Sequence, residues 1–460
     1  MMKLFRFMML ALFVLAIISA CSDGGNTAAH SQWTWVSGSN SSNQAGSYGT
    51  KNTAATTNVP GARMNATSWV DKSGKLWLFG GNGYYDSTRS GDILNDLWNF
   101  DGSKWTWVSG SNTGSQAGIY GTKGIPAATN VPGARINAAS WIDKSGNLWL
   151  FGGGGYDSTG AKGYLNDLWM FDGTNWTWVN GSSTQALATV VYGTKGIPSA
   201  TNMPGRRYSA VTWTDSIGHL WLFGGFGYDS TGSEGYLNDM WMFDGTNWTW
   251  MGGSNTSNNY GNFGTKGIPA STNMPRARVN AVSWTGGDGN LWLFGGDGYE
   301  PLPAIVALND LWKFDGNNWT WVSGSNSANQ VGTYGIKGTP AATNIPGARS
   351  RAVSWADGRG RLWLFGGLGY ASTDSGSQLN DLWSFDGTNW TWVSGSNIAN
   401  QVNNYGTKGM PAATNLPGGR NSAVSWTDDG GNLWLFGGNA YDPALTESGI
   451  IHNDLWLYQP

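Results

Sequence analysis

One pattern, repeated six times along the chain, constrains the fold more than any other feature of the sequence. The string Leu-Trp-Leu-Phe-Gly-Gly recurs at steps of 72, 72, 71, 71 and 71 residues, and its copies begin at Leu76, Leu148, Leu220, Leu291, Leu362 and Leu433. The string Asn-Asp-(Leu/Met)-Trp keeps the same period, beginning at Asn95, Asn166, Asn238, Asn309, Asn380 and Asn453, as does Trp-Thr-Trp, beginning at Trp33, Trp105, Trp176, Trp248, Trp319 and Trp390. A fixed internal period indicates an array or a closed ring of one structural unit.

The first unit contains four predicted strands. They are Arg63–Val70, Lys75–Phe79 (closed by the pair Gly80-Gly81), about Leu94–Phe100, and Trp105–Val108. Short turns separate the first strand from the second and the third from the fourth, as expected for antiparallel neighbours. Alternate residues of a strand point to opposite faces, so the second strand is leucine-rich on one face and aromatic on the other. Both faces must be covered, and six like sheets cover them when each packs between two others.

The two ends of the chain are out of phase by one strand. Residues 33–36 read as an isolated fourth strand, and residues 453–458 read as an isolated third strand. Main-chain hydrogen bonds between them would complete the sixth unit and close a ring. We therefore predict an all-β, six-bladed β-propeller over residues 33–460, made of four-stranded antiparallel blades and closed by pairing of the N-terminal strand with the C-terminal strand. We expect this ring to be monomeric.

At this point the chain resembles the kelch-repeat β-propeller family. The resemblance rests on the paired glycines after the second strand, the tryptophan that opens the fourth, and the aromatic residue that ends the third: Phe100, Phe171, Phe243, Phe314, Phe385 and Tyr458. It covers about residues 33–458. The third-to-fourth turn is shorter than is usual in the family, and the repeat is about 20 residues longer than the ≈ 50 of a kelch repeat. The extra length lies in inserts between blades such as Ser109–Ala134.

The first 32 residues differ from the rest. Lys3 and Arg6 precede an apolar stretch from Phe7 to about Ile18, which is typical of a secretory signal and is short for a transmembrane helix. The small residues before Cys21, the only cysteine, resemble the cleavage site of bacterial lipoproteins. We therefore expect a signal peptide over residues 1–20, lipidation of Cys21 and a tether over residues 21–32. This places the protein in a bacterial cell envelope as a lipid-anchored membrane protein, in the outer membrane if the cell has two.

The charge of the chain argues against one class of partner. The formal net charge is -3 and charged residues make up 12% of the sequence. Nucleic acids attract proteins through clustered positive charge, so we expect no nucleic-acid partner.

The parity of the strands divides the loops between two faces of the ring. The first-to-second and third-to-fourth turns are short and share one face, the short-turn face. The second-to-third loops and the inserts are long and share the other, the long-loop face. Long loops on a rigid scaffold are where binding residues concentrate, so we expect ligands there. The fourth strand starts at the short-turn face, so Trp33 and the tether should place that face toward the membrane.

Residues recur in rings of six at the long-loop face. The first strands open with Arg63, Arg135, Arg207, Arg278, Arg349 and Arg420, and the third strands open with Asp96, Asp167, Asp239, Asp310, Asp381 and Asp454. These rings are either structural ion pairs or, for some arginines, groups that hold a carboxylate or sugar hydroxyls. Arg206 and Arg351 add cations that break the symmetry.

A third ring consists of tyrosines three residues after each glycine pair. Its members are Tyr84, Tyr156, Tyr228, Tyr299, Tyr370 and Tyr441. These side chains either stack on sugar rings or pack the loops. We expect specificity at the irregular second-to-third loops, such as residues 300–303 and 442–445.

The sequence favours binding over catalysis. The copper chemistry of galactose oxidase, a kelch-scaffold enzyme, needs histidine and cysteine side chains that this chain cannot bring together, and a zinc site fails for the same reason, so we expect no cofactor. Acid–base work on sugars remains an alternative, because bacterial kelch propellers that mutarotate sialic acid have the same architecture. The three glutamates, Glu234, Glu300 and Glu447, all lie in second-to-third loops.

Three functions therefore remain open. The first is a non-enzymatic envelope protein that binds glycan or protein ligands at its long-loop face. The second is a sugar-modifying periplasmic enzyme, and the third is a structural or adhesion component of the envelope.

Overall fold

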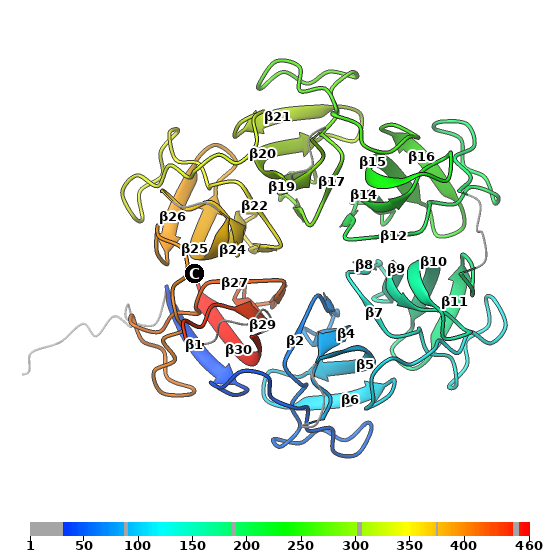
Figure 1. Ribbon diagram of the computed structural model, residues 1–460, viewed down its shortest axis with the longest axis horizontal. Helices are drawn as coiled ribbons and strands as arrows, with labels where there is room; N and C mark the ends of the chain where they lie inside the picture. Colours follow the sequence, from blue (N-terminus) through cyan, green and yellow to red (C-terminus); the bar gives the residue numbers. More distant parts are fainter. Residues whose placement is uncertain (1–30, 87–90, 186–189, 301–305, 374–375, 445–449) are drawn as a thin grey trace, which may run out of the picture.

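The chain forms a closed ring of six antiparallel sheets around a central axis (Figure 1). The computed structural model describes residues 31–86, 91–185, 190–300, 306–373, 376–444 and 450–460. Each sheet is a blade whose first strand lies nearest the axis and whose fourth lies at the rim (Figure 1). The prediction of an all-β, six-bladed propeller with four-stranded antiparallel blades is confirmed.

The first strand of every blade is divided into two short pieces. Blade 1 contains β2 (Arg63–Met64), β3 (Thr67–Val70), β4 (Leu76–Gly83), β5 (Asp92–Phe100) and β6 (Trp105–Ser109), and blade 2 contains β7 (Arg135–Ile136), β8 (Ala139–Ile142), β9 (Leu148–Tyr156), β10 (Lys162–Phe171) and β11 (Trp176–Asn180). Blade 3 contains β12 (Arg207–Tyr208), β13 (Val211–Thr214), β14 (Leu220–Tyr228), β15 (Glu234–Phe243) and β16 (Trp248–Gly252), and blade 4 contains β17 (Arg278–Val279), β18 (Val282–Thr285), β19 (Leu291–Gly298), β20 (Val306–Phe314) and β21 (Trp319–Ser323). Blade 5 contains β22 (Arg349–Ser350), β23 (Val353–Ala356), β24 (Leu362–Gly369), β25 (Ser377–Phe385) and β26 (Trp390–Ser394), and blade 6 contains β27 (Arg420–Asn421), β28 (Val424–Thr427), β29 (Leu433–Ala440), β30 (Ile451–Gln459) and β1 (Gln32–Ser37).

The glycine pair does not end the second strand, as the sequence had led us to expect. In blade 1 this strand continues to Gly83, and the third strand begins at Asp92. The register shifts at the glycine pair, which is a β-bulge. Gly80 and Gly81 have φ values of 64° and 95°, and a Cβ on Gly80 would lie 2.8 Å from the carbonyl oxygen of Arg135 in blade 2. The glycines are needed because the neighbouring blade approaches the bulge so closely.

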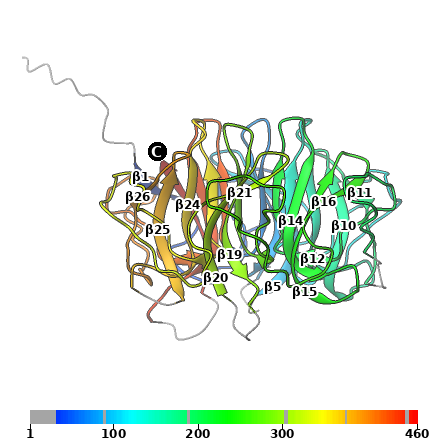
Figure 2. The ribbon, with the colours of Figure 1, turned by 90° about the horizontal axis from the view of Figure 1, so that it is seen from above.

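The ring closes through the two ends of the chain. Strand β1 pairs antiparallel with β30, so that Trp33 faces Tyr458 and Trp35 faces Trp456. The N-terminal strand is thus the fourth strand of blade 6, as predicted. Because β30 ends at the short-turn face, β1 begins there, and the C-terminus lies on the same side (Figure 2).

Two rings of hydrogen bonds link neighbouring blades around the axis. Two residues separate the pieces of each first strand, and the first of them has a φ between 52° and 58°. Its N–H donates to the carbonyl of its equivalent in the preceding blade at 2.9–3.3 Å. These six residues are Asn65, Asn137, Ser209, Asn280, Arg351 and Ser422. In the opposite direction, the indole N–H of each first-strand tryptophan donates to the backbone of the next blade at 2.7–3.2 Å, and Trp426 completes the circle by donating to Trp77. Both rings run without a break through the blade that joins the chain ends.

Each insert covers the outer edge of a blade instead of projecting from the long-loop face, where we had expected it. In blade 1, Ala55 forms a β-bridge with Trp105 of the fourth strand. The ammonium of Lys51 donates to the carbonyl of Gly110 at 2.9 Å and lies 4.4 Å from the ring centroid of Trp107. The fourth strand would otherwise expose unpaired backbone groups at the rim, and the insert satisfies part of that edge.

Tryptophan packing between blades forms the core. One cluster joins Trp69 and Phe79 of blade 1 to Leu150, Trp169 and Trp176 of blade 2, and five similar clusters follow around the ring. In the described part of the chain, no helix has the length and apolar character that crossing a bilayer requires.

Strands β1 and β26 are the fourth strands of blades 6 and 5, and Trp33 and Trp390 occupy equivalent positions in them. Because β1 completes blade 6 as β26 completes blade 5, the two tryptophans should contribute alike to stability, although only β1 is not joined to its blade by a turn.

The test is to compare Trp33→Ala with Trp390→Ala. Both indoles are 1% exposed at equivalent positions, so each substitution should lower the free energy of unfolding by about 3–5 kcal/mol. Urea denaturation followed by tryptophan fluorescence measures this. If Trp33→Ala left stability unchanged while Trp390→Ala reduced it, β1 would not be the strand that completes blade 6.

Candidate functional site

The ring of arginines forms buried ion pairs. In blade 1 the guanidinium of Arg63 donates two hydrogen bonds to Asp96, both at 2.7 Å, and the two side chains are 1% and 0% exposed. Burial alone would lower the pKa of Arg63, but the charge and hydrogen bonding of Asp96, together with Tyr48, outweigh the burial and the pKa is raised. The same pair recurs in every blade, between Arg135 and Asp167, Arg207 and Asp239, Arg278 and Asp310, Arg349 and Asp381, and Arg420 and Asp454. Of the two alternatives for these rings, the structure matches the ion pair, and the six arginines are removed from our candidate ligand contacts.

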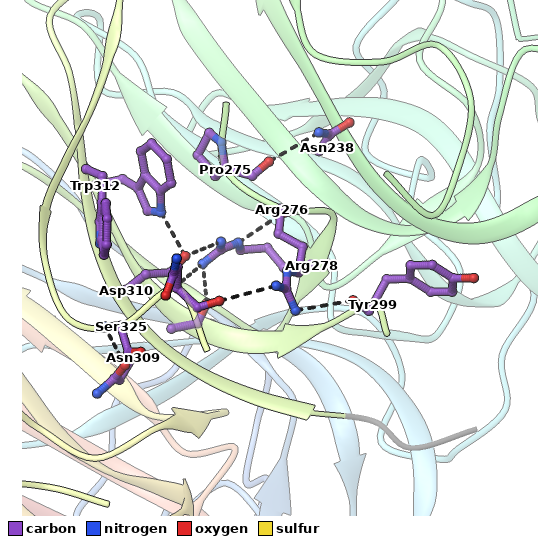
Figure 3. Close-up of polar contacts among 12 residues, drawn as sticks. Asn238, Pro275, Arg276, Arg278, Tyr299, Asn309, Asp310, Trp312 and Ser325 are labelled. Carbon is purple, nitrogen blue, oxygen red and sulfur yellow. Dashed lines mark hydrogen bonds and ion pairs between the residues drawn. The ribbon is translucent and has the colours of Figure 1, made fainter. Parts of the chain in front are cut away.

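Each aspartate also accepts hydrogen bonds from aromatic side chains. Asp96 accepts from the hydroxyl of Tyr48 at 2.8 Å and from the indole of Trp98 at 2.7 Å. Blade 4 lacks the tyrosine, because Phe263 occupies its place in the insert. Figure 3 shows the result: Asp310 lies between Arg278 and Trp312. We did not predict a role for the insert tyrosines, although they recur at the same period as the arginines.

The other predicted cations differ in their surroundings. Arg206 is 8% exposed and donates to the carbonyl of Thr184. Arg351 is exposed and lies at the mouth of the central channel, because it is the blade 5 member of the inner hydrogen-bonded ring. Asparagine or serine occupies its place in the other blades. Arg351 is therefore the arginine from our candidate set that faces solvent.

The predicted tyrosine ring divides by blade. Tyr228 and Tyr299 lie against other aromatic side chains, whereas the hydroxyl of Tyr156 lies at hydrogen-bond distance, 2.9 Å, from the hydroxyl of Ser115, and Tyr441 lines a cavity in blade 6. Tyr84 and Tyr370 are half-buried in the loops of blades 1 and 5. All six side chains keep some exposed surface, but the structure gathers only part of this ring into a common site.

The blades differ most in one row of residues at the long-loop mouth. This mouth row consists of one residue from each of the first three strands, held in register across the blade. It reads Met64, Asn82 and Ile93 in blade 1; Ile136, Gly154 and Tyr164 in blade 2; Tyr208, Phe226 and Tyr236 in blade 3. It continues with Val279, Asp297 and Ala307 in blade 4; Ser350, Leu368 and Gln378 in blade 5; and Asn421, Asn439 and Ile451 in blade 6. Blade 3 alone has three aromatic residues in this row.

Aromatic rings form a continuous arc around this part of the mouth. The centroids of Tyr164 and Tyr208 are 5.1 Å apart, those of Tyr208 and Phe226 are 5.7 Å apart, and those of Phe226 and Tyr236 are 5.3 Å apart. Beyond them the arc continues through Tyr299 to Tyr260, with steps of 6.5 and 5.5 Å. Tyr260 is 40% exposed and the other five rings are half-buried. This aromatic arc, from Tyr164 in blade 2 to Tyr260 beside blade 4, presents apolar ring surface to solvent.

Charged groups border the aromatic arc. The hydroxyl of Tyr164 donates to Glu234 at 2.8 Å, and Asp297 accepts from the side chain of Asn280 at 3.0 Å. Burial and then the charge of Glu234 raise the pKa of Tyr208, while the charge of Arg351 opposes them. The arc therefore combines apolar rings with both signs of charge, an arrangement suited to a ligand that has apolar faces and polar edges.

A cavity opens at the blade 2 end of the arc. It has a volume of about 400 Å³ and is lined by residues of blades 1, 2 and 3, among them Asp92, Lys162, Tyr164 and Tyr208. One carboxylate oxygen of Asp92 accepts a hydrogen bond from Ser115 at 2.5 Å. The volume lies within the range of small-molecule sites.

The described histidines lie far from one another. His219 pairs with Asp215 at 3.1 Å on the short-turn face, whereas His452 is buried in β30 at the opposite end of the strands. In the residues for which coordinates are described, no three His, Cys, Asp or Glu side chains gather as they would around a metal ion. Cys21, His30 and Glu447 fall outside the described residues, and so do the predicted signal peptide and most of the tether.

Comparison with known proteins agrees with this geometry. A kelch repeat-containing protein of Arthroderma benhamiae is 23% identical over 350 residues, which make up 70% of this chain and 47% of that protein. The chain therefore spans about half the length of this curated relative. The fold is that of a kelch-type propeller.

Two solved structures resemble the chain at low sequence identity. The structure of YjhT has a TM-score of 0.50 and 16% identity, covering 86% of this chain and 95% of that one. A fungal alcohol oxidase in complex with copper has a TM-score of 0.46 and 13% identity, over 91% of this chain and 77% of that one. No protein-family model matches the chain. At these identities the kelch-type likeness concerns the fold, and the site must be argued from its own residues.

The missing hydroxyl in blade 4 predicts that Phe263→Tyr stabilises the propeller. The added hydroxyl should donate to Asp310, as Tyr334 does to Asp381 at 2.7 Å, and raise the free energy of unfolding by about 1–2 kcal/mol. The converse change, Tyr334→Phe, should lower it by a similar amount in urea denaturation. A neutral or destabilising Phe263→Tyr would show that blade 4 cannot accept the shared geometry.

The buried His452 predicts a loss of stability in mild acid. Burial lowers its pKa from the ordinary 6.5; the charges of Asp454 and Asp442 oppose this, and that of Arg420 adds to it. The unfolded chain therefore binds a proton at pH values where the folded chain does not, so stability falls as the pH drops below 6.5. His452→Leu should reduce the decrease in melting temperature between about pH 7.5 and pH 5. An unchanged decrease in this variant would assign the acid sensitivity to other groups.

Proposed function

We propose that this kelch-type propeller is a non-enzymatic binding protein of the cell envelope, and that glycans bind along its aromatic arc. One observation carries the proposal: repeats that agree almost everywhere else place three aromatic rings in register in one blade only. The scaffold does not need these rings, because five other blades fold with different residues in the mouth row. Aromatic surface concentrated on one side of the mouth is therefore best explained by a ligand that is not six-fold symmetric.

The chemistry of the arc favours sugars over other small ligands. A sugar ring has an apolar face that packs on tyrosine or phenylalanine, and hydroxyl groups at its edge that need hydrogen-bonding partners. Glu234 and Asp92 supply acceptors beside the rings, and the exposed Lys162 and Arg351 supply donors. A purely apolar ligand would leave these polar groups without partners.

The length of the arc favours a chain of several sugars. Six rings follow one another across three blades, and the cavity of about 400 Å³ at one end accommodates a terminal unit. A single sugar would contact only a part of this surface.

The membrane attachment is part of the proposal. Lipidation of Cys21 would anchor the chain through a short tether to the start of β1, which lies at the short-turn face. The aromatic arc at the opposite face would then point away from the membrane. In a cell with two membranes we place the anchor in the outer one.

A second candidate function rests on Glu234 and Tyr164. Their hydrogen bond of 2.8 Å places an acid and a base side by side within the arc, as a sugar-modifying enzyme would require. Burial and Glu234 raise the pKa of Tyr164, however, and this makes its hydroxyl a poor proton source near neutral pH. We therefore favour binding without turnover.

Substitution of the arc should weaken glycan binding. Tyr208→Ala and Tyr236→Ala should each reduce affinity about 3- to 10-fold for sugars identified on a glycan array, because each removes one stacking contact. Tyr370→Ala in blade 5, outside the arc, is the matched control. Isothermal titration calorimetry measures the affinities, and chromatography of the recovered sugar detects turnover.

Three results would count against the proposal. Equal losses in the Tyr370→Ala control would mean that the arc is not the site. Chemical change of the sugar would favour the enzyme. Absence of binding to any glycan, with loss of cell attachment on deletion of the gene, would favour an adhesion component.

A further inference from the structure

Blade 6 contains a second cavity, well separated from the aromatic arc. It has a volume of about 460 Å³, and its lining includes Asn403, Tyr405, Tyr441, Asp442 and His452. The arc belongs to blades 2 to 4, and blade 6 lies across the ring from blade 3 (Figure 1). A ligand in this cavity would therefore not contact the arc.

Departures from the repeat build this cavity. His452 occupies the position at which the other blades have a buried leucine: Leu94, Leu165, Leu237, Leu308 and Leu379. Asn403 occupies the position of Gly46, Gly118, Gly261 and Gly332 in blades 1, 2, 4 and 5. A buried leucine stabilises a blade and a buried imidazole does not, so the scaffold gives no reason for His452.

A chain of hydrogen bonds fixes the tautomer of His452. The hydroxyl of Tyr405 donates to Asp454 at 2.9 Å, so its proton is committed to that carboxylate. The Nδ1 atom of His452 lies 3.3 Å from the same hydroxyl oxygen and must therefore be the donor in that contact. The other ring nitrogen, Nε2, is left as an acceptor, and among the described residues it has no hydrogen-bond partner. Burial favours this neutral form.

Two other side chains add polar groups to the cavity. The carbonyl oxygen of Asn403 accepts hydrogen bonds from the backbone N–H of Gly418, at 2.7 Å, and from Arg420, which leaves its amide N–H groups as donors. One carboxylate oxygen of Asp442 accepts from the N–H of Ala444 at 2.9 Å. Arg420 itself is committed to Asp454 and is 1% exposed, so it offers no charge to an anion.

We propose that this cavity is a second binding site, for a small neutral polyol such as a single sugar ring. A hydroxyl of the ligand would donate to Nε2 of His452, and a neighbouring hydroxyl would accept from the amide of Asn403. The tyrosines supply apolar surface for the carbon skeleton. The proposed site binds the polyol without changing it chemically.

Nuclear magnetic resonance of the histidine side chains tests the proposal. Free glucose, galactose and N-acetylglucosamine are added separately to the full chain labelled at histidine. At least one of them should shift the imidazole signals of His452 and leave those of His219 in place, because His219 lies on the short-turn face.

Two variants give matched controls, because each introduces the residue that other blades have. Asn403→Gly should keep the melting temperature and weaken the sugar affinity measured at His452 about tenfold, the effect of one lost hydrogen bond in a buried site. His452→Leu should abolish the binding that calorimetry detects at this cavity. Tyr208→Ala, which removes part of the arc, should leave the shift of His452 unchanged.

Several outcomes would overturn the proposal. They are the absence of any shift with all three sugars, a shift with Zn²⁺ and with none of the sugars, and an Asn403→Gly variant that binds as tightly as the parent chain. If Tyr208→Ala removed the shift, the arc would be the only sugar site. Failure of the arc proposal alone would leave the response of His452 intact.

Discussion

Packing of each sheet against the next is the interaction on which this propeller depends. Both faces of every blade are apolar, so a blade on its own would expose tryptophan and leucine to water on two sides. The six core clusters each join two neighbouring blades, and none is confined to one. The rings of hydrogen bonds around the axis follow from the same geometry, because each first strand lies where it can reach the blades before and after it.

The repeated charges serve this packing. A guanidinium and a carboxylate that are both buried must satisfy each other, and the arginine–aspartate pairs do so with two hydrogen bonds in every blade. The aspartate also accepts a hydrogen bond from the indole of its own strand and, in five blades, from a tyrosine of the insert. The pair thus ties together the first strand, the third strand and the insert at one point. The inserts in turn cover the rim, where a fourth strand would otherwise expose its edge.

Residues that break the repeat are the better guide to function. The mouth row changes from blade to blade, whereas the arginine that precedes it in each first strand and the glycine pair that precedes it in each second strand do not. The aromatic residues of blade 3 and the histidine of blade 6 are the strongest departures. Each creates an asymmetric site on a symmetric scaffold, and the two sites lie on opposite sides of the ring.

The sequence by itself determined the number of blades, the order of the strands and the closure of the ring. The repeat period, the alternation within each strand and the strand type at each end of the chain can all be read directly along the sequence. It also contained the arginine and aspartate rings, but left open whether they face each other or a ligand. That question depends on burial, which arises only when β2 and β5 are placed on either side of the glycine bulge. The aromatic arc depended even more on tertiary structure. Tyr164 and Tyr236 occupy equivalent positions one repeat apart, whereas Tyr208 lies on a first strand, and only the register of the sheet and the neighbouring blade bring the three rings together.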